Sequence, residues 1–207
     1  MKYYIIIPAH NEESFLGLTL QSIIDQTILP SKIVVVNDNS TDKTGDITLD
    51  FAKNNQTITL VNKTSEAIHL PGSKVIQAFN KGLETVDDDY DFIVKADADL
   101  IFPPTYFETI INHFRSDDTI GMVGGFAYIE KNGNWILENL TDKDHIRGAF
   151  KAYRKATFKQ MYGFRSFIYQ SNRLIVFGES QSNFSRFIGR IVIDNHNFCR
   201  QNSLLDN

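Results

Sequence analysis

The sequence predicts an α/β domain with a mostly parallel central sheet flanked by helices. In the first two thirds of the chain, short β-rich apolar runs alternate with segments whose apolar residues recur at helical spacing. The 207 residues, 42% of them hydrophobic, are enough for one domain with a full core. Polar clusters follow the expected strand ends, which is where open parallel sheets bind ligands.

The expected strands and helices follow one another along the chain. Strands are expected at residues 3–7, 32–36, 57–61, 91–95, 120–128 and 135–137. Helices with one apolar face are expected around Leu16, Leu20, Ile23 and Ile24, around Ile47 and Phe51, around Val75 or Ile76 with Phe79 and Leu83, and around Phe107, Ile110, Ile111 and Phe114. Asn11 and Ser40 are expected to cap the first two helices, because short polar side chains suit the unpaired N–H groups there. A last helix is expected to begin with Ile146, Ala149, Phe150 and Tyr153 and to run to about Met161.

The last 44 residues differ in composition from the rest. All 13 lysines lie at or before Lys159, whereas five of the eight arginines follow position 163. Beyond short apolar runs at 174–177 and 191–193, this part shows little periodicity. We therefore expect a domain over residues 1–163 and a divergent C-terminal tail over 164–207.

The composition excludes several classes of protein. A net charge of −4 gives no general attraction for nucleic acid or anionic lipid. The single cysteine, Cys199, cannot form an intramolecular disulfide, which favours a reducing compartment. The sequence has no signal peptide and no apolar run approaching the ~18 residues of a membrane helix. We expect a cytoplasmic protein whose contact with a membrane, where it has one, is peripheral.

Three polar clusters suit a nucleotide. Residues 8–13 follow the first strand and open a helix, where short polar side chains and free N–H groups meet a ligand. Residues 37–42 follow the second strand, and Asp38 there can accept hydrogen bonds from a base or a ribose. Residues 71–74 place a glycine and Lys74 at a helix start, which suits a diphosphate. Taken alone, each cluster is also explained by ordinary helix capping or a solvated turn.

The fourth cluster is a pair of aspartates, Asp97 and Asp99, at the end of a buried strand. In extended backbone, residues two apart point to the same side, about 6–7 Å apart at their α-carbons. Carboxylates, water and phosphate oxygens are the ligands that Mg2+ or Mn2+ prefers, so the pair can hold a cation that bridges a diphosphate. By contrast, the acidic run Asp87–Asp89 is expected to be a solvated turn.

The order of the four clusters is typical of one family. They read IIIPAHNEE at 5–13, VNDNSTDKT at 36–44, GSK at 72–74 with Ala78 and Asn80, and KADAD at 95–99. With these motifs, the chain resembles the family 2 glycosyltransferases over about residues 3–163. That resemblance implies the GT-A fold, a Rossmann-like nucleotide-binding fold, and inverting transfer of a sugar from a nucleoside-diphosphate donor to an acceptor.

The resemblance also implies roles for individual residues. Pro8, Ala9, His10, Asn11, Glu12 and Asp38 would contact the nucleoside, Lys74 would lie by the donor, Asp97 would face the ribose or the metal, and Asp99 would bind Mn2+ or Mg2+. The segment 147–154 with Tyr162 and Gly163 looks like the acceptor side of the family, and a basic amphipathic helix explains it equally well.

The general base of the family is missing from its usual place. After Gly163 the family usually supplies an acidic pair, often beside a tryptophan, whereas the only tryptophan here is Trp135 and the acids of the tail are isolated. Glu179 is the nearest candidate for the base, and Asp142 and Asp144 are alternatives with no motif behind them. We hypothesise that the tail is a truncated or replaced acceptor region, for example after a frameshift; the missing acidic pair would then lie in another reading frame of the downstream gene sequence.

Three functions are compatible with these patterns. The first is a metal-dependent inverting glycosyltransferase acting on a saccharide or lipid-linked acceptor. The second is a nucleotide-sugar binding domain with little or no catalysis, because the base motif is missing. The third, a nucleotidyltransferase, ranks last because residues 8–13 are not the glycine-rich phosphate loop that it would need.

Overall fold

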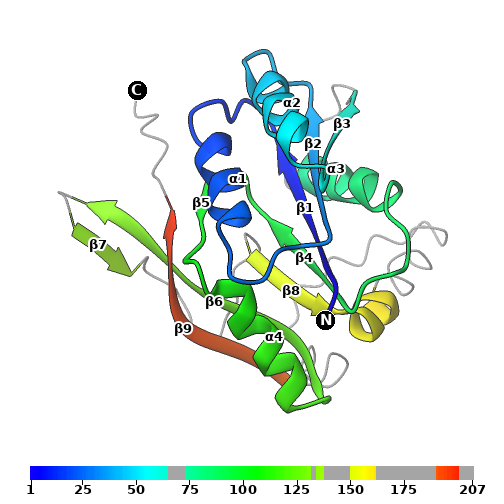
Figure 1. Cartoon of the computed structure of the whole chain (residues 1–207), viewed down its shortest axis with the longest axis vertical. Helices are drawn as coiled ribbons and strands as arrows, with labels where there is room; N and C mark the ends of the chain where they lie inside the picture. Colours follow the sequence, from blue (N-terminus) through cyan, green and yellow to red (C-terminus); the bar gives the residue numbers. More distant parts are fainter. Residues whose placement is uncertain (65–72, 132–133, 138–149, 162–189, 201–207) are drawn as a thin grey trace.

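The computed structural model describes residues 1–64, 73–131, 134–137, 150–161 and 190–200, and its sheet is drawn in Figure 1. The strands are β1 (Tyr3–Ala9), β2 (Lys32–Asp38), β3 (Ile58–Lys63), β4 (Phe92–Ala96), β5 (Leu100–Ile101), β6 (Ile120–Lys131), β7 (Asn134–Leu137), β8 (Phe150–Arg154) and β9 (Arg190–Arg200). The helices are α1 (Leu16–Ile24), α2 (Thr44–Asn54), α3 (Ser73–Leu83) and α4 (Tyr106–Ser116), and residues 155–161 form a further short helix.

The strand order across the described part of the sheet is β3-β2-β1-β4-β8-β6-β9-β5, with β7 paired to β6. Strands β3, β2, β1 and β4 are all parallel. Beyond β4 the sheet is mixed, since β8 pairs antiparallel with both β4 and β6. The predicted α/β class is confirmed, and the parallel part places the carboxyl ends of four strands along one edge.

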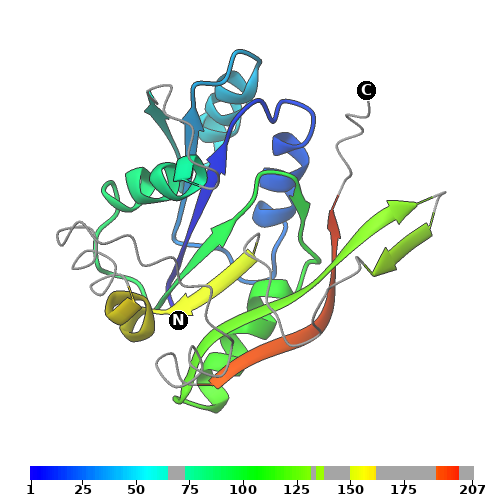
Figure 2. The same cartoon turned by 180° about the vertical axis from the view of Figure 1, so that it is seen from behind.

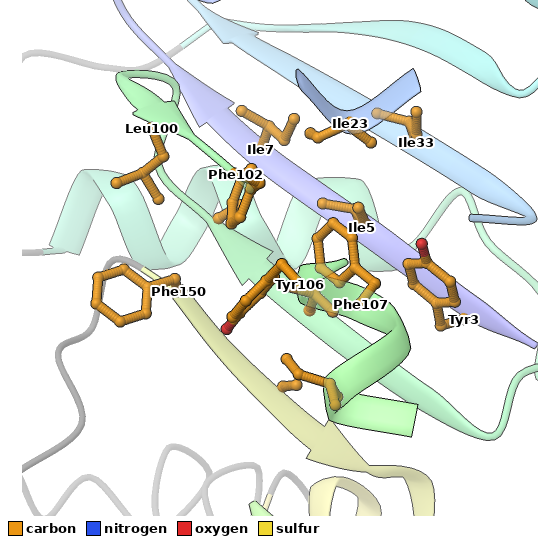
Figure 3. Close-up of a cluster of buried hydrophobic side chains, with 14 of the residues drawn as sticks. Tyr3, Ile5, Ile7, Ile23, Ile33, Leu100, Phe102, Tyr106, Phe107 and Phe150 are labelled. Atoms are coloured by element: carbon orange, nitrogen blue, oxygen red, sulfur yellow. The ribbon is translucent and has the colours of Figure 1, made fainter. Parts of the chain in front are cut away.

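The two faces of the sheet are covered separately, because successive side chains of a strand point to opposite faces. On one face Tyr3, Ile5 and Ile7 of β1 pack with side chains from α1 and α4, as Figure 3 shows. The rings of Tyr3 and Phe92 stack there at 4.9 Å. On the other face Tyr4 and Ile6 pack with α3 and with the helix 155–161. Figure 2, which views the molecule from the side opposite to Figure 1, shows this second face. Strands β1, β2 and β4 are thus buried on both faces, whereas the edge strand β3 is largely half-exposed or exposed.

The expected last helix is wrong in its first part, because residues 150–154 form strand β8. Phe150 and Ala152 are buried, whereas Lys151 and Tyr153, each next in the chain, are half-exposed, which is the alternation of a strand. Pairing with β4 satisfies the backbone of β8, and Arg154 donates to the carbonyl oxygens of neighbouring segments. The helix starts only at residue 155. Ile146 and Ala149 lie outside the described residues.

The two expected caps are also wrong. Phe15 and Lys43 occupy the N-cap positions of α1 and α2, and neither makes a side-chain cap bond. Instead, the Ser40 hydroxyl accepts a hydrogen bond from the Asn11 N–H at 3.0 Å. These side chains therefore join two loops to each other, and this non-local pairing competes with local capping.

The expected apolar face of α3 needs one correction. Val75 and Ile76 are exposed, whereas Ala78, Phe79 and Gly82 face the sheet. The small residues Ala78 and Gly82 let the helix lie close to β1 and β2, so Phe79 stays in the buried stripe while Val75 and Ile76 fall outside it.

The acidic run Asp87–Asp89 is exposed, as expected of a solvated turn, and it also binds several basic side chains. Lys32 and the Tyr4 hydroxyl both donate to Asp87, and Lys159 donates to Asp88. Lys2 forms an ion pair with Asp89 at 2.5 Å. The turn thus gathers lysines from distant parts of the chain. These hydrogen bonds, that of Lys32 foremost, hold the pKa of Asp87 well below its usual range.

Stability should therefore fall in acid partly through Asp87. A carboxylate whose pKa is depressed by folding stabilises the native state above its unfolded pKa of about 4, and that contribution is lost as the pH falls below it. We expect the melting temperature of Asp87→Asn to decline less steeply between about pH 5 and pH 3 than that of the parent chain. Thermal melts across this range measure it. Asp118→Asn, at a nearly fully exposed side chain, is the control and should keep the parent's slope; equal slopes for all three proteins would contradict the prediction.

Strand β9 brings part of the tail into the same sheet. Residues 190–200 pair in parallel with β6 and antiparallel with β5, as Figure 1 shows for the red strand. Sequence periodicity indicates only 191–193 of this strand, and the run 174–177 lies outside the described residues. Within the described residues, no helix is long and apolar enough to cross a membrane.

Candidate functional site

The first two polar clusters meet at the carboxyl ends of β1 and β2. Because the two strands are parallel neighbours, both loops leave the sheet at the same edge. His10 Nδ1 lies 2.6 Å from the backbone oxygen of Asp38. His10 and Asn11 are exposed and Glu12 is half-exposed, whereas the side chain of Ala9 is buried in the core. Ala9 would therefore reach a ligand only through its backbone.

A network of hydrogen bonds holds the two loops together. The Asn11 side chain accepts from the Thr41 N–H at 2.8 Å, and the Thr44 hydroxyl accepts from the Glu12 N–H at 2.8 Å. Asn11 and Asn39 both adopt a φ of 56°, in the left-handed region that asparagine tolerates better than most residues. The loops thus form one interlocked unit at the sheet edge.

The same network fixes the charge of Asp42. Burial alone would raise its pKa, but hydrogen bonds from Thr44 and from the Glu13 N–H outweigh burial and hold the pKa below its usual range. Glu13 in turn accepts from the Lys43 N–H at 3.0 Å. Asp42 is therefore a structural carboxylate of the loop unit.

Asp38 is joined to a lysine from the third strand. Lys63, the last residue of β3, places Nζ 3.2 Å from Asp38 Oδ1. The two side chains are only 12% and 8% exposed, so this is a largely buried ion pair. Removing one partner of such a pair would leave an uncompensated charge. The pair extends the site from β1 and β2 to β3.

The aspartates Asp97 and Asp99 lie at the end of β4, beside β1. The expected extended backbone is wrong here, because β4 ends at Ala96 and a turn leads to β5. Both aspartates are nevertheless half-exposed, whereas Ala98 between them is 2% exposed. Lys95 Nζ donates to Asp97 Oδ1 at 2.5 Å. The turn presents two carboxylates and buries the residue that separates them.

The chemistry of these residues fits a hard divalent cation. Mg2+ is usually bound by one or two carboxylates together with water and substrate phosphates, and Asp97 and Asp99 supply two carboxylates on one turn. Within the described residues, no group of three or more His, Cys, Asp or Glu side chains converges on one point.

The structure does not join every candidate residue to this edge. Lys74 lies in the first turn of α3, half-exposed, and among the described residues it makes no hydrogen bond or ion pair with the other candidates. Pro8 is half-exposed at the end of β1. The candidate bases Glu179, Asp142 and Asp144 lie outside the described residues.

Sequence reasoning missed Lys63 and Lys95. Lys63 is the last residue of β3 and Lys95 the last but one of β4, and each pairs with an aspartate that was a candidate in its own right. The sequence signal that could have identified them is a lysine at the carboxyl end of an apolar run, which is the same position by which the aspartates were identified. What the sequence did not give was the pairing, because residues 25 apart meet only when β2 and β3 are side by side.

Comparison with known proteins gives a family match and a common fold. The model of "Glycosyl transferase family 2" matches residues 4–178. The chain is 29% identical over 144 residues to "Glycosyltransferase GlyA" of Streptococcus pneumoniae serotype 4, covering 68% of this chain and 19% of that protein. It is 28% identical over 176 residues to an undecaprenyl-phosphate mannosyltransferase of Micrococcus luteus, covering 77% of this chain and 69% of that protein.

Solved structures share the fold at low sequence identity. S. aureus TarS 1–349 in complex with UDP-GlcNAc superposes with a TM-score of 0.67 at 17% identity, over 100% of this chain and 60% of that one. The mannosyltransferase PcManGT of Pyrobaculum calidifontis, in complex with GDP-Man and Mn2+, gives 0.61 at 15% identity, over 96% and 56% of the two chains. These are GT-A glycosyltransferases. The chain spans well under half the length of the first curated relatives, at 19%, 36% and 31% of their residues.

Proposed function

Since the chain belongs to glycosyltransferase family 2, we propose that it moves a sugar, with inversion, from a nucleoside-diphosphate donor to a saccharide or lipid-linked acceptor, with Mn2+ or Mg2+ as cofactor. The observation that carries the proposal is the meeting of three strand ends at one edge. There the loops that follow β1 and β2 interlock through His10 and Asp38, and the turn with Asp97 and Asp99 follows the neighbouring β4.

The base of the donor would lie against Asp38 and Lys63. A carboxylate accepts hydrogen bonds and an ammonium group donates them, so the pair matches a base that offers an N–H beside a C=O. Uracil and guanine present that arrangement, and they are the bases of the nucleotide sugars in the TarS and PcManGT complexes. The pair therefore fits UDP or GDP sugars as donors. By itself it does not exclude cytosine, whose amino group and unprotonated ring nitrogen also form a donor beside an acceptor.

The diphosphate would lie toward the aspartate turn. Asp97 and Asp99 would hold the cation, and Lys95 would keep Asp97 oriented through its hydrogen bond. When bound, the cation supplies Lewis-acid stabilisation of the leaving diphosphate. Lys74 is a further candidate for the phosphates, because it lies in the first turn of a helix, where N–H groups favour anions.

The acceptor site and the general base would be supplied by the second half of the chain. We keep Glu179 as the candidate base, with Asp142 and Asp144 as alternatives, and residues 164–207 as an altered acceptor region, of which β9 extends the sheet beside β6. A cytoplasmic protein in peripheral contact with the inner membrane face would suit a lipid-linked acceptor. The absence of the usual acidic pair from the sequence favours one second candidate, a nucleotide-sugar binding domain with little or no turnover.

Calorimetric titration with UDP, GDP and CDP, each with and without Mn2+, tests the donor site. We expect binding of UDP or GDP that needs Mn2+, and the titration with CDP shows whether the site selects the base. Release of free nucleotide from the corresponding nucleotide sugar then separates enzyme from binding module. Binding without release favours the second candidate, and no binding of any nucleotide contradicts both.

Replacing Lys63 should weaken this base recognition. Lys63→Met removes the ammonium group and leaves the Asp38 carboxylate largely buried without its ion pair. Hydrogen bonds to charged groups contribute about 1.5–3 kcal/mol, so we expect at least a roughly tenfold loss of nucleotide affinity. Lys63→Arg keeps the charge and should retain most of the affinity in the same titration. Equal affinities of Lys63→Met and the parent chain would rule out this role.

A further inference from the structure

Helix α1 carries a buried stripe of polar side chains. Thr19, Ser22 and Gln26, the last just beyond the helix end, are 0%, 9% and 6% exposed and follow one another at helical spacing. Burying polar groups costs free energy unless each finds a hydrogen-bond partner. A stripe of this kind in place of leucine or isoleucine therefore indicates specific partners in the neighbouring segment.

All three side chains form hydrogen bonds with the backbone of residues 98–107, which comprise part of the aspartate turn and the segment after it. The Thr19 hydroxyl donates to the carbonyl oxygen of Ala98 at 2.6 Å, and the Ser22 hydroxyl accepts from the Phe102 N–H at 3.1 Å. Gln26 donates to the carbonyl oxygen of Pro103 at 2.7 Å and accepts from the Phe107 N–H at 3.2 Å. Strand β5 in this segment is only two residues long. The stripe thus supplies backbone partners that so short a strand does not.

Thr19 acts at the residue that separates the two aspartates. Its hydroxyl lies 3.3 Å from the carbonyl oxygen of Phe15, the usual partner of a helical threonine, but is much closer to that of Ala98. The carbonyl of Ala98 belongs to the peptide unit that leads into Asp99. A hydrogen bond to this carbonyl restrains the plane of that peptide, and the Asp99 side chain leaves the backbone at the α-carbon that ends this plane.

We propose that Thr19 is a positioning residue for the cation ligands, a role that rests on the proposed function of Asp97 and Asp99. Helix α1 follows the loop after β1, and His10 and Asn11 of that loop bind the loop after β2. One helix therefore connects the nucleoside side of the site to the aspartate turn. Thr19 touches neither donor nor cation. It sets the backbone from which the carboxylates project.

Thr19→Val tests the role, because valine keeps the shape and removes the hydroxyl. Thr48→Val is the matched control: Thr48 is also 0% exposed, but its hydroxyl bonds to Thr44 within α2. Thr19→Ser keeps the hydroxyl and serves as the conservative variant. The first readout is Mn2+ affinity in saturating UDP or GDP, followed by electron paramagnetic resonance of free Mn2+. The second is amide hydrogen exchange across residues 96–102, which needs no metal.

We expect Thr19→Val to weaken Mn2+ binding about 10- to 100-fold, as loss of groups that orient metal ligands commonly does, and to speed exchange in 96–102. Thr19→Ser should stay within about threefold of the parent chain, and Thr48→Val should change neither readout even where it lowers the melting temperature. Parent-like Mn2+ affinity and slow exchange in Thr19→Val would overturn the positioning role, as would an equal loss in Thr48→Val. If the parent chain bound no Mn2+ while Thr19→Val still sped exchange, the proposed function would fail and the structural tie between Thr19 and the turn would stand.

Discussion

Replacing Asp99 with asparagine should lower the Mn2+-dependent affinity for UDP or GDP at least about 100-fold. The cation is expected to contribute several kcal/mol to holding the diphosphate, and each 1.4 kcal/mol corresponds to a factor of ten. Asparagine keeps the size of the side chain but replaces a charged carboxylate with a neutral amide that has one oxygen fewer, which a hard divalent cation binds less tightly. The loss should therefore come from the changed ligand and not from a change in packing.

Calorimetric titration with and without Mn2+ separates this effect from a general loss of the site. In the absence of cation, Asp99→Asn and the parent chain should bind the nucleotide equally weakly. Asp118→Asn is the matched control, since its side chain is 98% exposed and follows α4 rather than β4. Its titration should match that of the parent chain. If Asp99→Asn kept its Mn2+-dependent affinity, the aspartate turn would not be the cation site.

Asp97→Asn should behave differently from Asp99→Asn. Asp97 already accepts a hydrogen bond from Lys95, so its substitution also removes the partner of a lysine that is only 18% exposed. We expect a loss of stability together with the loss of affinity, because a mostly buried ammonium group loses the negative charge of this neighbour. Asp99 is for this reason the cleaner test of the cation site.

The sequence predicted those parts of the fold whose signal is local. Apolar runs such as 3–7 and 32–36 lie in the buried parallel part of the sheet, where a strand reads as a continuous apolar stretch. The meeting of these polar loops was predictable for the same reason, since the carboxyl ends of parallel neighbours share one edge. Order along the chain was enough to bring Asp38 and Asp97 to that edge without any knowledge of their partners.

What the sequence did not predict depends on contacts between distant residues. Strand β8 has helix-compatible spacing, and only its position between β4 and β6 makes it a strand. Asn11 and Ser40 are residue types that commonly cap helices, but here they form a hydrogen bond that joins the two loops. The Lys63–Asp38 pair and the Thr19–Ala98 bond likewise join residues 25 and 79 positions apart. Local patterns cannot rank such partners against local ones.

Replacing Gly82 with alanine should destabilise the protein, although alanine is the better helix former. Within α3 the substitution gains about 1 kcal/mol of helix propensity. A Cβ at this position, however, would lie 2.6 Å from Ile6 Cγ2 and 2.9 Å from Val36 Cγ2, far inside ordinary contact distance. Both neighbours are β-branched residues of the central sheet, whose χ1 angles are restricted. Overpacking of this kind costs about 1–3 kcal/mol or more, so repulsion should outweigh propensity.

Gly17→Ala separates helix propensity from steric repulsion, because it makes the same substitution in a helix without the clash. A Cβ on Gly17, near the start of α1, would meet Ile47 and Phe51 at 3.9 Å, which is ordinary van der Waals contact. Thermal melts should show Gly17→Ala equal to or above the parent chain and Gly82→Ala lower by several degrees, at roughly 2–4 °C per kcal/mol for a chain of this size. A parent-like melting temperature for Gly82→Ala would mean that α3 can move away from β1 and β2. Since α3 carries Lys74, that movement would also displace this candidate phosphate ligand. Among the described residues, Lys74 is not bonded to the other candidate site residues.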